Sequence, residues 1–312
     1  MKKFIFLLII SSCFHININA QSDSNKIKAP TLNGHQFSST GYISSSFINT
    51  NLQANIGIGI TSPITLQGVV INDVELFAFE GKILFFDTQI QYQQRFTDWL
   101  ALYGTIKMAG RIGTNMSTIV VDGVNTLSGG DIGWLIRIKQ GKKFNLSADI
   151  SIHKITGNFI NVVKYLEDLI DNNPNASITV KVPAMSVNTG LRYAYAFNPA
   201  FGIQATGNFS YGESLRRNES AAYFSGGIVG EVDFNPNYQV PIGLSIGYGL
   251  TSFPDVVMNN GGVSNLFSSR IGYTGSTDFE LGIQYSFYDM YLESLQEKAI
   301  VSKLQLILKF YF

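Results

Sequence analysis

Side chains alternate between apolar and polar along most of this chain, and the charged residues of the alternating segments fall on the polar face. In residues 86–96 the even positions are Phe86, Thr88, Ile90, Tyr92, Gln94 and Phe96, and the odd positions are Asp87, Gln89, Gln91, Gln93 and Arg95. A period of two residues is that of an extended strand, whose successive side chains point to opposite faces of a sheet. The sequence therefore predicts an all-β protein.

Twelve such segments follow one another from residue 52 to the C-terminus, and their connections alternate between short and long. The short connections include Thr97-Asp98 and the turn 140–143. The long connections cover roughly 62–83, 113–127, 155–185, 253–265 and 289–299, with one shorter member at 213–220. This alternation predicts antiparallel hairpins with their tight turns at one end of the sheet and their long loops at the other.

The distribution of charge indicates what the apolar face contacts. The polar face of the strand cores carries nine basic and six acidic residues, and the apolar face carries none. A basic side chain facing lipid costs about 2–4 kcal/mol at the bilayer midplane, which accounts for such an exclusion. We therefore expect a closed antiparallel transmembrane β-barrel of about 12 strands. Fourteen strands are the alternative, if residues 62–83 contain an additional hairpin.

The N-terminus has the layout of a secretory signal peptide. Lys2 and Lys3 precede the apolar run 4–10, and Ala20 is a small residue at the expected cleavage point. We predict a signal peptide over residues 1–20, cleaved after Ala20, with a lipoprotein-like cleavage at Cys13 as the less favoured alternative. Residues 21–50 are polar, and they form either a flexible periplasmic lead or a plug inside the lumen. Residues 51–312 form the barrel.

Composition excludes several other classes of protein. Charged residues are 14% of the chain and aromatic residues 13%, yet no apolar run after the signal peptide approaches the roughly 20 residues of a transmembrane helix. Without Lys2 and Lys3, the 22 Lys and Arg residues become 20 against 22 acidic residues, a net charge near −2. This balance gives no reason to expect a nucleic-acid partner.

The last segment ends on an aromatic residue at the C-terminus itself. Its apolar face consists of Ile300, Leu304, Leu306, Leu308, Phe310 and Phe312. With this ending and its twelve alternating segments, the chain resembles the outer-membrane β-barrel proteins of Gram-negative bacteria. The resemblance implies a place in the cell outer membrane, with the membrane lipid and the barrel assembly machinery as partners, and Phe310 and Phe312 as the assembly signal. The glycine usual in that signal would fall at Ile307 and is missing.

A barrel places the charged face inside, and this gives a set of predicted lumen-lining residues. They are Asp87, Arg95, Lys107, Arg111, Asp131, Arg137, Asp149, His153, Arg192, Arg270, Glu280 and Lys303. Pairing across the turn 140–143 is expected to set Asp131 near His153 and Asp149 diagonal to Arg137. Pairing across Thr97-Asp98 is expected to set Gln89 near Lys107 and Asp87 diagonal to Arg111.

One long connection contains a predicted helix. The stretch "NFINVVKYLEDLIDNNP" has Asn158 at the N-cap position and Pro174 beyond its end. Its apolar stripe consists of Phe159, Val162, Val163, Leu166, Leu169 and Ile170. Because an external helix must bury such a stripe, we expect it to cap the mouth of the barrel as a gate.

These features favour a pore or transporter for a small solute, gated by extracellular loops. A closed structural or surface-recognition barrel that acts through its loops is the alternative, and an outer-membrane lipid hydrolase is less favoured. Ser151 and His153 share a strand face, but it is the lumenal face, away from lipid. Apart from these residues, only His35 remains as a possible general base after cleavage. We therefore predict no enzymatic activity, no cofactor and no metal site.

Overall fold

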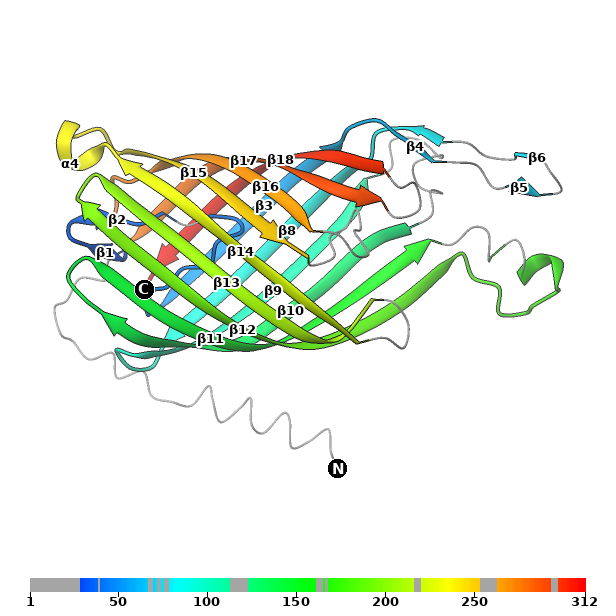
Figure 1. Cartoon of the computed structure of the whole chain (residues 1–312), viewed down its shortest axis with the longest axis horizontal. Helices are drawn as coiled ribbons and strands as arrows, with labels where there is room; N and C mark the ends of the chain where they lie inside the picture. The colour runs from blue at the N-terminus through cyan, green and yellow to red at the C-terminus, as the bar shows by residue number, and fades with distance from the viewer. Residues whose placement is uncertain are drawn as a thin grey trace, which may run out of the picture.

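The computed structural model forms a barrel that is elongated along its axis (Figure 1). The structure describes residues 29–38, 40–66, 70–71, 74–75, 79–112, 123–160, 165, 168–215, 220–252, 263–292 and 297–312. The predicted signal peptide and the cleavage points at Ala20 and Cys13 lie outside the described residues.

Twelve strands make one closed antiparallel sheet, which confirms the predicted fold class. The strands are β3 (Asn51–Thr61), β8 (Leu84–Arg95), β9 (Leu100–Ile112), β10 (Gly123–Gln140), β11 (Phe144–Ile160), β12 (Thr179–Asn198), β13 (Phe201–Glu213), β14 (Ser220–Asp233), β15 (Ile242–Thr251), β16 (Ser264–Tyr273), β17 (Phe279–Leu292) and β18 (Glu297–Tyr311). Each strand pairs with the next one along the chain, and β18 closes the sheet against β3. Closure leaves no strand edge with unpaired backbone groups.

The fourteen-strand alternative is wrong, because β3 pairs directly with β8. The residues between these two strands form two separate small sheets, β4 (Ile64–Leu66) with β7 (Phe79–Gly81) and β5 (Val70–Ile71) with β6 (Val74–Glu75). Both sheets lie beyond the end of the barrel, at the right of Figure 1. The short turns lie at the opposite end, where α4 (Asn235–Tyr238) is found.

Burial follows the predicted two-residue period along the strands. In β15, Ile246 is 74% exposed on the outer face, whereas its neighbour Ser245 is 5% exposed in the lumen. Large apolar side chains such as Ile106 and Ile132 are exposed on the outer face in the same way. Exposed aromatic residues gather where strands meet the short turns, and include Phe96, Trp99, Phe197, Phe201 and Phe312. An apolar band with an aromatic girdle at its rim is the surface that a bilayer requires of a barrel.

The closing strand β18 is paired with β3 along most of its length. Its backbone pairs with β3 from Val301 to Tyr311, and the Phe312 amide donates to the Thr50 carbonyl over 3.1 Å. Phe310 lies on the outer face, 43% exposed, whereas Lys309 is 2% exposed in the lumen. The last residues are therefore part of the barrel wall.

Several strands are longer than predicted, so the connections between them are shorter. The strand β11 has 17 residues and β12 has 20, although about 9–11 residues cross a bilayer. The added lengths carry the exposed residues Lys154 and Lys181, which would be unfavourable beside hydrocarbon. We infer that this hairpin projects beyond the bilayer at the end with the long loops.

The predicted helix is wrong in its extent. Asn158 and Phe159 lie in β11 and pair with Lys181 and Val180 of β12. Tyr165 and residues 168–170 are helical, and this turn of helix lies beyond the barrel strands in Figure 1. Among the described residues, no helix is long and apolar enough to cross a membrane.

The N-terminal segment, described for residues 29–38 and 40–50, lies inside the barrel at the end with the short turns. It contains the short strands β1 (Thr31–Leu32) and β2 (His35–Gln36), which pair with each other. Its side chains His35 and Phe37 are at most 2% exposed. Leu32, Phe37 and Phe47 of the segment pack with Ala194 and Ala196 of β12 in one buried cluster. The segment is thus packed against the inner wall.

Candidate functional site

The lumen between the N-terminal segment and the long-loop end is the candidate site. The predicted registers are confirmed, since Asp131 lies opposite His153 and Gln89 lies opposite Lys107. The Asp131 carboxylate is bound on one side by His153 Nδ1 and on the other by Lys107 Nζ, at 3.1 Å. These three side chains from β9, β10 and β11 form one charged group on the lumenal wall.

A second group of lumenal side chains, around Asp149 and Arg192, is buried. Asp149 is diagonal to Arg137 in the register, as predicted, but its ion-pair partner is Arg192 of β12, with Nε 2.8 Å from Oδ1. The Tyr103 hydroxyl donates to Asp149 over 3.1 Å, and the Arg192 guanidinium lies 5.1 Å from the centre of the Tyr103 ring. Arg192 also donates to the Ser45 carbonyl over 3.1 Å, so this group joins the wall to the N-terminal segment.

The other predicted lumenal residues are distributed along the barrel. Asp87 accepts from Lys303 across β3, at 3.4 Å, rather than from its diagonal neighbour Arg111. Arg270 and Glu280 are buried, with 3.9 Å between Nη2 and Oε2. Arg95 is an exception, because its half-exposed side chain pairs with Asp98 in the turn after β8 and does not line the central lumen.

Hydrogen bonds to the barrel wall hold the N-terminal segment in place. The Ser46 carbonyl accepts from Asn145 at 2.5 Å and from Ser147 at 2.6 Å. The Ser38 amide donates to Glu231 at 2.8 Å, and the Ser38 carbonyl accepts from Gln204 at 2.9 Å. These bonds reach from β11 to β14 around the barrel. Most of them use the backbone of the segment, which no sequence pattern reveals.

His35 is a buried contact of the segment, although the sequence singled it out only as a possible general base. Its Nδ1 donates to the Pro199 carbonyl over 3.1 Å, and its Nε2 faces Glu231 Oε2 at 3.8 Å. The ring thus joins the segment to the turn after β12 and lies beside Glu231 of β14.

Tyr42 forms the inner floor of the remaining space. Its hydroxyl is hydrogen-bonded to Ser268, and burial raises the pKa of the phenol to about 12, so it stays neutral at pH 7. The ring lies against Gly247, where a Cβ would collide with the Tyr42 hydroxyl. A glycine is needed at this position for the segment to approach the wall so closely.

Above Tyr42 the lumen contains a chamber of about 400 Å³. Its wall is mostly made of amide, hydroxyl and charged side chains, including Asp87, Gln89, Gln91, Tyr103, Lys107, Asp131, Ser151, His153, Asn188, Arg192, Asn208 and Ser225. The two cations Lys107 and Arg192 balance the carboxylates Asp87 and Asp131. The chamber can therefore hold a small solute through hydrogen bonds without an excess of charge.

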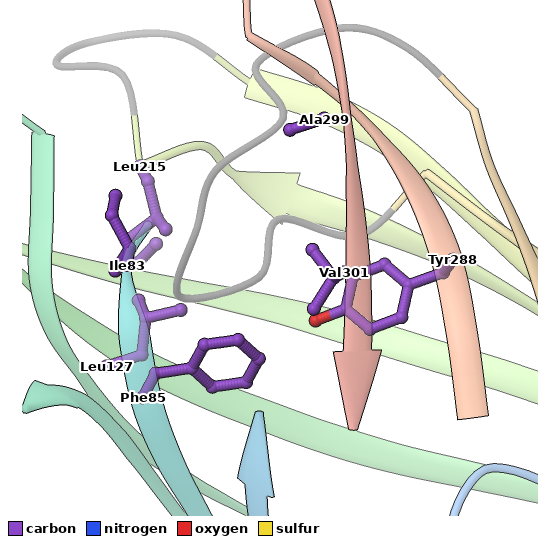
Figure 2. Close-up of a cluster of buried hydrophobic side chains, with 8 residues drawn as sticks. Ile83, Phe85, Leu127, Leu215, Tyr288, Ala299 and Val301 are labelled. Carbon is purple, nitrogen blue, oxygen red and sulfur yellow. The ribbon is translucent and has the colours of Figure 1, made fainter. Parts of the chain in front are cut away.

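An apolar cluster lies at the long-loop end of the chamber (Figure 2). It consists of Ile83, Phe85, Leu127, Ala184, Leu215, Tyr288, Ala299 and Val301. Sequence reasoning missed it, although a signal was present: Phe85 shares the face of Asp87, and Val301 shares the face of Lys303. Apolar residues on the polar face of a strand thus marked the apolar end of the lumen.

The predicted loop gate does not take the expected position. Leu169 and Ile170 are 49% and 70% exposed, and Phe159 belongs to β11. Val162, Val163 and Leu166 lie outside the described residues. In the part of the helix that the structure describes, the apolar side chains point to solvent and do not fill the mouth of the barrel.

Ser151 is 3% exposed and faces the lumen, so it is directed away from the lipid-facing surface. Within the described part of the chain, no three His, Cys, Asp or Glu side chains are grouped so as to hold a metal ion. The Asp131–His153 pair lies in the chamber wall together with Lys107, in a network of paired charges.

No protein-family model and no curated protein sequence matches the chain. Among solved structures, it is similar to the KdgM porin in complex with disordered oligogalacturonate, with 8% identity, a TM-score of 0.44, and coverage of 84% of this chain and 99% of that one. It is also similar to a mutant of the TodX monoaromatic hydrocarbon channel (10% identity, TM-score 0.47, coverage 92% and 97%) and to a Pseudomonas aeruginosa FadL homologue (9% identity, TM-score 0.43, coverage 92% and 99%). We infer no solute from these similarities. The closed sheet of twelve strands, its apolar outer face and its polar lumen have the architecture of a transmembrane β-barrel.

Proposed function

We propose that the chain is a channel for a small solute, captured in a closed state. The observation that carries this proposal is the chamber of about 400 Å³, lined by polar side chains and floored by Tyr42 of the N-terminal segment. A barrel with a purely structural role has no need of such a space. The short-turn end, where the segment lies, would face the periplasm, because short turns of outer-membrane barrels lie on that side.

In this proposal, the channel opens when the N-terminal segment moves out of the lumen. It is attached to the barrel wall covalently only through β3, and it is held by hydrogen bonds such as those of Ser38 and Ser46 and by the buried apolar contacts of Leu32, Phe37 and Phe47. Hydrogen bonds released into a wet lumen are replaced by bonds to water, so each contributes only about 0.5–1.5 kcal/mol. The segment can therefore withdraw while the twelve strands stay paired.

A reversible disulfide tests this proposal. The only cysteine of the chain, Cys13, lies in the predicted signal peptide, so the mature protein offers a cysteine-free background. Ser46 and Ser147 touch, since the Ser147 hydroxyl donates to the Ser46 carbonyl over 2.6 Å. We expect the pair Ser46→Cys and Ser147→Cys, when oxidised, to block the uptake of small neutral solutes into proteoliposomes, and reduction to restore it. The two single variants are the matched controls.

Equal uptake by the oxidised and reduced protein would contradict a moving segment. Absence of uptake from the wild-type barrel, with folding shown by its heat-modifiable migration in gels, would contradict the channel itself. The result would then favour a closed surface-recognition barrel. One observation supports that second candidate, namely the exposure of Leu169 and Ile170 on the helical turn beyond the barrel.

The remaining assignments follow from the barrel. The apolar outer band would contact outer-membrane lipid, and the C-terminal residues Phe310 and Phe312 would be recognised by the barrel assembly machinery before β18 closes the sheet. We propose no enzymatic role, because Ser151 is directed into the lumen and is 3% exposed. A lipid hydrolase would need this hydroxyl at the lipid-facing surface.

A further inference from the structure

The apolar cluster above the chamber has members on opposite sides of the lumen. It contains Ala184 of β12 and Val301 of β18. In the closed order of twelve strands, β12 is the third and β18 the ninth from β10, so they are six places apart and face each other across the barrel. The cluster also has members on β8, β10 and β17, so its side chains line the lumen along the wall from β12 round to β18.

The side chains of this cluster are packed tightly. Phe85 is 1% exposed and Val301 is fully buried. In Figure 2, Phe85 and Leu127 lie together on one side of the cluster, and Tyr288 lies with Val301 on the other. Gly59 of β3 makes room for the Phe85 ring, because a Cβ at that position would collide with it. Leu215, which follows β13, joins the cluster from the long-loop end.

The cluster and the chamber share part of their wall. Leu127 belongs to both, and Ala109, Ile155 and Leu266 line the chamber while they pack against the cluster. The chamber therefore changes from polar at Tyr42 to apolar at its outer end. A solute that arrives from the long-loop end must pass the apolar side chains before it reaches the hydrogen-bonding groups.

Apolar constrictions act on ions and on uncharged molecules in opposite ways. A narrow apolar passage loses its water and becomes a barrier to ions, which cannot keep their hydration shell in it. Unpaired charges lose much solvation energy in such surroundings, whereas an apolar molecular face loses none. A barrier of this kind therefore selects by polarity as well as by size.

We propose that this apolar cluster is the outer selectivity barrier of the channel, which admits small uncharged solutes with an apolar face and excludes ions. The inference rests on the proposed function and extends it by naming the class of solute. It assigns the selectivity to Phe85, Leu127, Tyr288 and Val301 and not to the helical turn of the β11–β12 connection. The polar chamber behind the barrier then binds the hydrogen-bonding groups of the same solute.

The rate at which a chamber thiol is modified from outside tests this inference. Ser225 of β14 lines the chamber, and Ser225→Cys places a single thiol there in an otherwise cysteine-free mature protein. The probes are methanethiosulfonates of similar size that carry an ammonium group, a sulfonate group or an uncharged ethyl group. Asn175→Cys, exposed in the β11–β12 connection, reports the rate for a free thiol.

With the cluster intact, we expect the Ser225→Cys thiol to react with the uncharged reagent. Its reaction with either charged reagent should be about tenfold or more slower than that of Asn175→Cys. Two double variants of equal shape separate polarity from volume. Phe85→Thr with Leu127→Thr should open the chamber to the charged reagents, whereas Phe85→Val with Leu127→Val should not. Heat-modifiable gel migration shows that each variant is folded.

The selectivity barrier would be refuted, but not the channel, by either of two results. One is equal modification rates for charged and uncharged reagents at the Ser225→Cys thiol; the other is equal rates for the charged reagents in the Thr and Val double variants. If no reagent reached Ser225→Cys in any folded variant, while Asn175→Cys reacted, the chamber would be sealed and the barrier and the channel would both be refuted. A selective barrier together with solute uptake that the Ser46–Ser147 disulfide does not change would refute only the movement of the N-terminal segment.

Discussion

At the scale of single residues, the buried pair of Arg192 and Asp149 should dominate the stability of the lumen. Arg192→Leu would leave the Asp149 carboxylate buried without its ion-pair partner, beside the neutral Tyr103 hydroxyl, and we expect a loss of about 3–5 kcal/mol in the free energy of unfolding. Lys107→Met, at a pair whose lysine side chain is 47% exposed, should cost at most about 1 kcal/mol. Urea unfolding in phospholipid vesicles measures both. Equal losses would show that the Arg192 pair is hydrated.

The outer face gives a second prediction at this scale. Ile246 lies at the middle of β15 and is 74% exposed. If the apolar band contacts hydrocarbon, Ile246→Arg should lower the free energy of unfolding by about 2–4 kcal/mol in vesicles. The control is Asn175→Arg, at an exposed position beyond the barrel, which should change it by less than about 0.5 kcal/mol. An unchanged free energy of unfolding in Ile246→Arg would show that this face contacts water and not hydrocarbon.

The sequence predicts the orientation of side chains better than their partners. Alternation places Asp149 and Arg192 in the lumen, but it does not predict their ion pair, because they lie 43 positions apart on strands joined by a long connection. By contrast, Asp131 and His153 lie across a short turn, and the register of that hairpin follows from the turn itself. The hairpin register is therefore readable from the chain when its turn is short.

At the scale of elements, the helical turn between β11 and β12 should be dispensable for closure. Its side chains Leu169 and Ile170 are exposed, so they contribute no seal. Replacing residues 162–177 by a short glycine-serine linker should leave single-channel conductance in a planar bilayer unchanged. Phe85→Thr with Leu127→Thr, measured in the same way, is the comparison that should raise it. A steady conductance in the linker variant would show that the β11–β12 connection gates the channel.

The extent of this element could not be predicted from local pattern alone. The stretch from Asn158 has a capping residue and helical spacing of apolar side chains. In the structure, Asn158 and Phe159 continue the β11 ladder because β12 provides backbone partners at Lys181 and Val180. Pairing with a neighbouring strand thus overrides the local helical preference. The same effect lengthens β10, which begins at Gly123.

At the scale of the whole molecule, the barrel follows from the sequence and the position of its N-terminal segment does not. Alternation in twelve successive segments is compatible with few folds, because lipid around a barrel requires both charge on one face only and long antiparallel strands. Residues 29–50 have no such period. Their contacts, such as Ser38 with Gln204 and Ser46 with Asn145, join backbone carbonyls to wall side chains, and any polar segment offers the same carbonyls.

Hydrogen exchange of the intact protein should separate the segment from the barrel. Strand amides such as those of β11 and β12 are bonded on both sides of each strand, so they should exchange only by rare opening of the barrel. If the segment withdraws as a unit, the amides of Phe37, Ser38 and Gly41 should exchange together, and at least about tenfold faster than the strand amides. Mass spectrometry of peptides measures these exchange rates. The oxidised Ser46–Ser147 disulfide should slow this exchange, whereas the reduced form should not. Exchange of the segment at the rate of the strands would mean that it leaves only when the barrel opens, and solute passage would then need a route around it.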